Sequence, residues 1–213
     1  MVRDRIEAAA ARSGRSAQDI TLLAVTKKFP ASIICEAHAL GIREFGENYV
    51  QEFEGKSAAV AELSGARFHL IGHLQSNKTR RAAELFHVIQ TIDSVKLARR
   101  LDSEGKPLDV MIEVKLSEEQ TKAGADPAAL DELVPGVREC RNLTLAGLMT
   151  MPPWTDEAEP SRPYFVRLRQ LAEKYKLPQL SMGMSHDFEV AIEEGSTCVR
   201  IGTALFGPRP RPA

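Results

Sequence analysis

Apolar positions along the chain follow two alternating periods. Short runs rich in branched residues, such as residues 20–27, are typical of buried strands. Longer stretches with apolar residues three or four positions apart, such as residues 165–175, are typical of amphipathic helices. The strand-like runs are eight in number and lie at residues 20–27, 43–48, 67–74, 87–93, 108–115, 143–151, 177–184 and 198–205. The pattern therefore predicts strands and helices in regular alternation.

Residues that begin or prevent helices stand between these runs. Pro30 and Ser76 each precede a helical pattern. Asp126 followed by Pro127 supplies an N-cap residue and a proline at the first helical position. The segment 152–163 is the exception, because its four prolines predict a rigid loop before the next helix.

This alternation predicts the fold class. Strands that alternate with helices form parallel sheets with right-handed crossovers, and eight of them in 213 residues predict a closed (β/α)8 barrel, the TIM barrel. An open doubly wound sheet is the alternative, but its edge strands would need prolines or lysines, which none of the runs carries in that role. We expect one α/β domain, a barrel over residues 1–207, and a disordered tail at residues 208–213.

Composition excludes several classes of partner. The formal net charge is -1, so no basic field is available for nucleic acid or anionic lipid. Residues 1–14 form a charged helical pattern, and no apolar run is long enough to span a bilayer. Cys35, Cys140 and Cys198 are odd in number and lie in apolar surroundings, which predicts buried free thiols of a reducing compartment. We therefore expect a cytoplasmic protein, a monomer, with no nucleic-acid or membrane partner.

Lys27 ends the first strand-like run. A lysine at the carboxyl end of a buried strand is partly desolvated, which lowers its pKa and makes its amine able to condense with an aldehyde. Neighbouring side chains on a strand point to opposite sides, so only Lys27 and not Lys28 is expected to reach the barrel mouth. A solvated loop lysine is the alternative, because lysines are mostly exposed.

The runs at residues 177–184 and 198–205 end in a predicted phosphate site. Active sites of such barrels lie at the carboxyl ends of the strands, with phosphate held after strands seven and eight. Ser185 precedes a helix, while Gly202 and Thr203 let backbone and hydroxyl approach an anion. Alternatively, Ser185 is only an N-cap and Gly202 only a packing glycine. Their joint position favours the phosphate site.

Arg200 is placed inside the barrel by alternation, where a guanidinium requires a partner. The pattern leaves two possibilities open: an ion pair with a glutamate such as Glu113, or a ligand atom that accepts a hydrogen bond. His69, His73 and His186 match no metal-ligand spacing, so no metal site is expected.

Six stretches that contain these residues carry a family resemblance. They are residues 22–27, FGENYVQE at 45–52, FHLIGHLQS at 68–76, GLMTM at 147–151, LSMGMS at 180–185 and GSTCVRIGTALFG at 195–207. In these stretches the sequence resembles the pyridoxal phosphate homeostasis protein family, whose barrel is similar to that of alanine racemases. One departure is His186, where family members often have a small or acidic residue.

The resemblance implies a role for each candidate residue. Lys27 would carry a Schiff base with pyridoxal 5'-phosphate, and Ser185, Gly202 and Thr203 would hold the phosphate. Asn48 and Met149 would line the ring, and Arg200 would face the pyridine nitrogen. An arginine leaves that nitrogen neutral, so the cofactor would be a weak electron sink.

The expected function is non-catalytic, with no catalytic residue. The protein would hold pyridoxal 5'-phosphate on Lys27, act in intracellular homeostasis of this cofactor and pass it to apo-enzymes. The alternative is a racemase or decarboxylase, which needs acid/base groups on both faces of the substrate carbon. Tyr49 and His73 are the candidates for the second face. A weaker alternative is a partner-binding module that uses the cofactor as a sensor.

Overall fold

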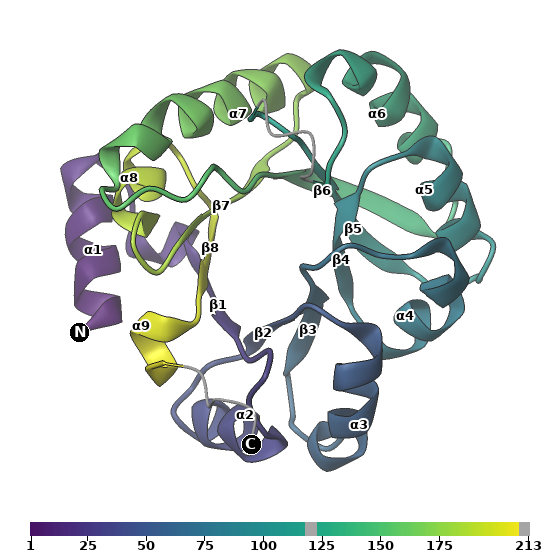
Figure 1. Cartoon of the computed structure of the whole chain (residues 1–213), viewed down its shortest axis with the longest axis horizontal. Helices are drawn as coiled ribbons and strands as arrows, with labels where there is room; N and C mark the ends of the chain where they lie inside the picture. The colour runs from purple at the N-terminus through teal and green to yellow at the C-terminus, as the bar shows by residue number, and fades with distance from the viewer. Residues whose placement is uncertain (118–122, 209–213) are drawn as a thin grey trace.

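The computed structural model describes residues 1–117 and 123–208, and its strands form a closed barrel. All neighbouring strands are parallel and follow each other in sequence order (Figure 1). The strands are β1 (Thr21–Val25), β2 (Glu44–Glu47), β3 (Arg67–Leu70), β4 (Val88–Ile92), β5 (Leu108–Glu113), β6 (Leu143–Met149), β7 (Gln179–Met184) and β8 (Cys198–Ile201). The predicted barrel is therefore confirmed, and the open sheet is excluded.

Helices surround the barrel (Figure 1). The α-helices of the described residues are α1 (Val2–Arg12), α2 (Ala31–Ala39), α3 (Val50–Val60), α4 (Thr79–Leu85), α5 (Val95–Asp102), α6 (Leu130–Arg138), α7 (Arg162–Tyr175), α8 (Phe188–Glu193) and α9 (Thr203–Phe206). Short 3-10 turns are η1 (Ala17–Asp19), η2 (Ser76–Lys78), η3 (Pro127–Ala129) and η4 (Glu159–Ser161).

Most of the eight strands end earlier than their apolar runs predict. The first run extends to residue 27, but β1 ends at Val25. The last extends to residue 205, but β8 ends at Ile201 and α9 begins two residues later. Periodicity does not separate a strand from a four-residue helix, and the carboxyl ends of barrel strands bend into loops. Lys27 consequently lies in a turn and not on the strand.

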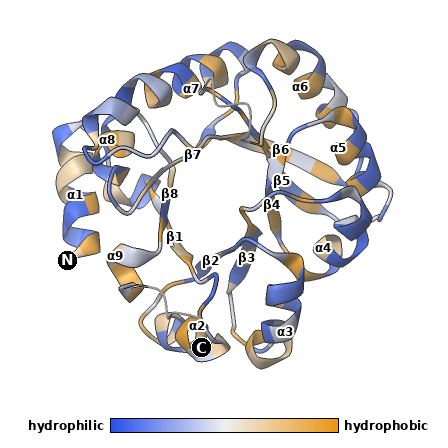
Figure 2. Ribbon diagram, viewed as in Figure 1, coloured by the Kyte–Doolittle hydropathy of each residue, from blue (hydrophilic) through white to orange (hydrophobic). Residues whose placement is uncertain are grey.

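The main apolar core lies between the strands and the outer helices. Apolar residues of the helices pack with apolar residues of the strands, as the predicted helical pattern requires, and the helix ribbons in Figure 2 carry both hydrophobic and hydrophilic residues. Val199 and Ile201 pack outward in a cluster with α1 and α8, so alternation correctly places Arg200 on the inner side. Inside the barrel, Ser181 of β7 is hydrogen-bonded to Gln90 of β4, which is not a neighbouring strand. The barrel interior is therefore partly polar.

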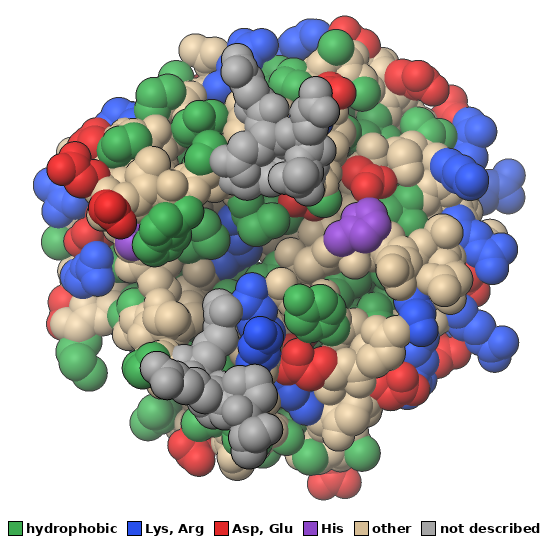
Figure 3. Space-filling model, in the orientation of Figure 1, with side chains coloured by type: hydrophobic (Ala, Val, Ile, Leu, Met, Phe, Trp, Pro, Cys, Tyr) green, Lys and Arg blue, Asp and Glu red, His purple; other side chains and the backbone are tan. Residues whose placement is uncertain are grey.

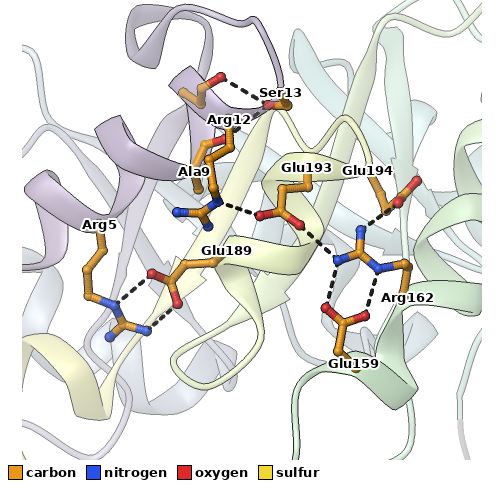
Figure 4. Close-up of polar contacts among 10 residues, drawn as sticks. Arg5, Ala9, Arg12, Ser13, Glu159, Arg162, Glu189, Glu193 and Glu194 are labelled. Atoms are coloured by element: carbon orange, nitrogen blue, oxygen red, sulfur yellow. Dashed lines mark hydrogen bonds and ion pairs between the residues drawn. The ribbon is translucent and has the colours of Figure 1, made fainter.

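Charged side chains lie mostly around the outer rim of the face shown in Figure 3. One group of them joins three helices (Figure 4). Arg5 and Arg12 of α1 pair with Glu189 and Glu193 of α8, at 2.9 and 2.8 Å. Arg162 at the start of α7 pairs with Glu159, Glu193 and Glu194, at 2.7 to 2.8 Å. These pairs raise the pKa of Arg162, and the shared Glu193 links α1 to α7.

The remaining expectations about the chain have mixed outcomes. All three cysteines are free thiols, but only Cys140 and Cys198 are buried. The expectation is wrong for Cys35, which is half-buried beside the core-facing Ile34 of α2. None of the helices in residues 1–117 and 123–208 is long and apolar enough to cross a membrane. The predicted disordered tail lies outside the described residues except for Pro208.

Candidate functional site

A cavity of about 450 Å³ opens at the carboxyl ends of the strands. This volume is in the range of small-molecule sites. Six of the seven predicted site residues line it: Lys27, Asn48, Ser185, Arg200, Gly202 and Thr203. Figure 3 shows the hollow near the middle of this face, with basic side chains inside it and apolar side chains around it. The structure thus brings together residues from strands far apart in the sequence.

Met149, the seventh predicted residue, does not line this cavity. It is fully buried on β6, while Met151 and Met184 take part in the cavity wall. The contact of Met149 with a ligand ring stays a prediction.

A tight turn after β1 presents Lys27. The Phe29 N–H donates to the Thr26 carbonyl at 3.1 Å, and Lys28 has a φ of 64°. This left-handed conformation costs a non-glycine residue about 1 kcal/mol. Lys27 is half-buried in the cavity wall, whereas Lys28 is exposed. The two side chains differ as predicted, but the turn and not strand alternation separates them.

The buried ammonium of Lys56 stabilises this turn. Lys56 of α3 donates to Glu47 at 2.9 Å, to Glu52 at 2.7 Å and to the Thr26 carbonyl at 3.0 Å. Thr26 also donates its hydroxyl proton to Glu47, at 2.8 Å. Burial raises the pKa of Glu47, and the hydrogen bond from Lys56 opposes that rise. Because Glu52 accepts the Lys28 N–H, the same cluster holds both sides of Lys27.

Lys56 was not predicted from the sequence, although two features of the sequence pointed to a buried, paired lysine. It is four residues after Glu52, the spacing of a helical ion pair. It also falls on the helix face that Phe53 and Val60 bury, where a lysine needs a partner.

The loops after β7 and β8 meet at Ser185. Its hydroxyl oxygen accepts the N–H groups of Gly202, at 3.2 Å, and Ala204, at 3.3 Å. Asp187, and not Ser185, is the N-cap residue of α8. The interpretation of Ser185 as only a helix cap is therefore wrong. Ser185 and the backbone N–H groups of Gly202 and Ala204 thus lie together at the cavity wall, where the phosphate site was predicted.

Gly202 is not required by packing. A β-carbon there would meet only Val25, at an ordinary contact distance of 3.6 Å. The space beside Gly202 belongs to the cavity, so the alternative interpretation as a packing glycine is not supported. Gly72 differs, because a β-carbon there would lie 2.2 Å from the Asn48 carbonyl oxygen. Gly72 thus permits the close packing that positions Asn48.

Arg200 has neutral hydrogen-bond partners. The residue is 3% exposed, and its guanidinium donates to the Ser181 hydroxyl and the Thr150 carbonyl, both at 2.8 Å. The proposed ion pair with Glu113 is absent within the described part of the chain. Burial lowers the pKa of Arg200, and burial raises the pKa of Glu113 to about 7, with the charge of Arg200 opposing that rise. Alternation predicts the side of the strand but not the partners across the barrel.

Two aromatic side chains lie at one edge of the cavity. The Trp154 and His186 rings pack with their centroids 4.1 Å apart. Both ring nitrogens of His186 are buried and without a hydrogen-bond partner among the described residues, although Nε2 lies 3.6 Å from Asp187. Trp154 was missed by the sequence analysis, and its place in the proline-rich segment 152–163 was the available signal.

The two candidates for a second acid/base face do not line the cavity. Tyr49 is 54% exposed, and His73 faces Asp93 at 3.7 Å. No cluster of three or more possible metal-ligating side chains occurs in residues 1–117 and 123–208.

Comparisons with known proteins agree with this architecture. The family described as "Alanine racemase, N-terminal domain" matches residues 2–210. A pyridoxal phosphate homeostasis protein of Escherichia coli (strain K12) is 48% identical to this chain, and the match covers 98% of this chain and 94% of the relative. The structure of PipY from Synechococcus elongatus PCC7942, with PLP bound, is 38% identical at a TM-score of 0.85 and covers 97% of this chain and 100% of its own.

More distant structures share the fold alone. Alanine racemase of Clostridium difficile 630 is 12% identical at a TM-score of 0.71, and the match covers 98% of this chain and 60% of the racemase. With barrel, cavity and relatives in agreement, the chain belongs to the pyridoxal phosphate homeostasis protein family, whose barrel is that of the alanine racemase N-terminal domain.

Proposed function

We propose that the cavity binds pyridoxal 5'-phosphate and that the protein holds this cofactor without catalysis, as part of its intracellular homeostasis. Lys27 is the proposed point of covalent attachment. Ser185, Gly202 and Thr203 are the proposed phosphate ligands. Asn48 and Met149 are proposed for the ring, and Arg200 for the pyridine nitrogen.

The observation that carries this proposal is the set of groups around one cavity. An amine, a permanent cation, and the Ser185 hydroxyl with the two backbone N–H groups that donate to it line its wall. The side-chain oxygen of Asn48 is buried there without a hydrogen-bond partner among the described residues. These groups suit the aldehyde, the ring nitrogen, the phosphate and the phenolic hydroxyl of pyridoxal 5'-phosphate. A ligand that carries only one of these four chemical groups would fit the cavity less well.

Arg200 supports a holding role. Bound pyridoxal phosphate supplies an electron sink for amino-acid chemistry, which is strong when its ring nitrogen is protonated. A guanidinium only donates in hydrogen bonds, so a ring nitrogen that accepts an N–H of Arg200 would stay unprotonated. In the described residues no carboxylate lies within ion-pair distance of Arg200. This disfavours rapid carbanion formation.

Attachment at Lys27 is tested by the visible absorption spectrum before and after borohydride reduction. The amine of Lys27 would replace the aldehyde oxygen, which leaves as water. We expect Lys27→Ala to abolish covalent attachment and Lys28→Ala to retain it, because only Lys27 lines the cavity. Reduced cofactor found on the Lys27→Ala protein would overturn this assignment. A protein that takes up no pyridoxal phosphate at all would overturn the proposed function.

The alternative function is a racemase, and turnover distinguishes it. Tyr49 and His73, the two candidates for the opposite face of the substrate carbon, do not line the cavity. We expect incubation with alanine or serine to give no more racemised or transaminated product than free pyridoxal phosphate gives. Faster turnover that disappears in Lys27→Ala would favour the racemase.

Delivery to apo-enzymes is the further part of the proposal. An imine on Lys27 is reversible by hydrolysis or by exchange with another amine, so attachment and release use the same residue. Mixing the loaded protein with an apo-enzyme and following recovery of the enzyme's activity tests transfer.

A further inference from the structure

The proposed attachment point and the proposed phosphate site follow two neighbouring strands. The paired register of β1 with β8 runs to Ala24 and Ile201. Lys27 lies three residues beyond Ala24, and Thr203 lies two residues beyond Ile201. The separation of Lys27 from the phosphate site therefore depends on contacts between the loops that follow the strands.

An aromatic contact joins these two loops. The ring centroids of Phe29 and Phe206 are 5.5 Å apart, and their planes meet at 54°. Tilted ring pairs at this distance are favourable beyond the apolar area that they bury. Phe29 is 8% exposed, and Phe206 is half-buried against the main apolar core. Neither ring lines the cofactor cavity. We call Phe29 and Phe206 the ring pair.

Each member of the ring pair is tied to one loop by its backbone. The Phe29 N–H donates to the Thr26 carbonyl at 3.1 Å, which closes the turn that presents the lysine. The Phe206 N–H donates to the Gly202 carbonyl at 3.0 Å, which closes α9. A displacement of either ring consequently moves the backbone of one proposed cofactor contact.

The turn that presents the lysine needs support from its surroundings. Lys28 has a φ of 64°, a left-handed conformation that is unfavourable for a residue with a β-carbon. Such a conformation persists where neighbouring contacts hold it. Lys56 bonds the Thr26 carbonyl, and Glu52 accepts the Lys28 N–H. The buried Phe29 ring, packed on α9, holds the carboxyl side of the same turn.

We propose that Phe29 and Phe206 are positioning residues that fix the separation between the Lys27 amine and the phosphate site. A ligand with both an aldehyde and a phosphate would then engage both sites at once. Binding of its second group is intramolecular, and the resulting gain in affinity requires that the two sites keep the matching separation. The inference rests on the proposed function and deepens it, because it explains a preference for phosphorylated over unphosphorylated aldehyde.

The test compares the affinities for pyridoxal 5'-phosphate and for pyridoxal, which carries the same aldehyde without phosphate. The ratio of the two affinities is measured in wild type, Phe29→Ala, Phe206→Ala and the double variant. We expect each single substitution to lower this ratio about fivefold, the scale of one aromatic pair. The double variant should lower it no further, because both substitutions remove the same contact. A loss of general stability would instead weaken the binding of both ligands equally.

Two variants serve as controls. Phe86→Ala removes a ring that is 3% exposed and packs on Phe53 with centroids 5.0 Å apart, outside the cavity wall. This variant should keep the wild-type ratio. Phe29→Leu retains most of the buried apolar volume and replaces Phe29→Ala if that variant does not fold, as judged by circular dichroism. We expect it to lower the ratio about twofold, because only the contact between rings is lost.

The possible outcomes separate this inference from the proposed function. A wild-type ratio in both Phe29→Leu and Phe206→Ala would overturn the inference and leave the proposed function standing. A ratio that falls in Phe206→Ala but not in any Phe29 variant would also overturn it, because α9 would then support the phosphate without the turn. An equal fall in Phe86→Ala would show general loosening and contradict a specific role. Wild-type protein that binds neither ligand would overturn the proposed function and the inference together.

Discussion

Replacement of Lys56 by methionine should lower the free energy of unfolding by about 3–5 kcal/mol at pH 7. The Lys56 side chain is 10% exposed, and its ammonium contacts Glu47, whose side chain is fully buried. Without it, the carboxylate of Glu47 keeps, among the described residues, only the Thr26 hydroxyl and must either stay charged in the interior or take up a proton. The Thr26 carbonyl also loses its partner, so the turn before Lys27 loosens.

Urea unfolding of three variants tests this interpretation. Lys96→Met is the control on an exposed lysine of α5 and should change stability by less than about 0.5 kcal/mol. The double variant Lys56→Met/Glu47→Gln should recover most of the loss, because no buried charge remains. Equal losses in Lys56→Met and the double variant would show that the ammonium acts by packing and not by charge.

The barrel itself was predictable because its strands carry their own signal. Eight apolar runs at regular spacing exclude most other α/β arrangements. A buried strand can be recognised from its own apolar run, without knowledge of its long-range contacts. The position of Lys27, Ser185 and Arg200 at one mouth followed from the rule that carboxyl ends of parallel strands meet at the same end. Six of the seven predicted site residues consequently line one cavity.

Partners across the barrel were not predictable. The ion pair of Arg200 with Glu113 is not found among the described residues, where Arg200 donates to Ser181 and Thr150, and the contact of Arg200 with a ligand stays a prediction. Inner side chains of a barrel meet according to strand tilt and register, which periodicity does not contain. The same holds for Lys56, whose three partners come from a turn, a strand and its own helix. Where the chain turns, as at Lys28, the local backbone conformation determines the direction of each side chain, and the hydrophobic pattern does not.

The side chain of Glu113 should make the protein less stable as pH rises. Burial at 3% exposure raises the pKa of this carboxyl to about 7 from an ordinary 4.5. The folded protein therefore keeps a proton that the unfolded chain has already released, and folded stability falls between about pH 4.5 and 7. Each pKa unit corresponds to about 1.4 kcal/mol, so the whole penalty is about 3 kcal/mol above that window.

Glu113→Gln should remove this penalty. We expect the variant and wild type to unfold at the same urea concentration near pH 4, and the variant to be more stable by about 3 kcal/mol at pH 8. Glu132→Gln, on an exposed glutamate of α6, should match wild type at every pH. A stability difference that does not vary with pH would contradict the raised pKa. Growth of the difference from pH 4 to pH 8 would establish that the charge of Arg200 stabilises ionised Glu113 by less than its burial costs.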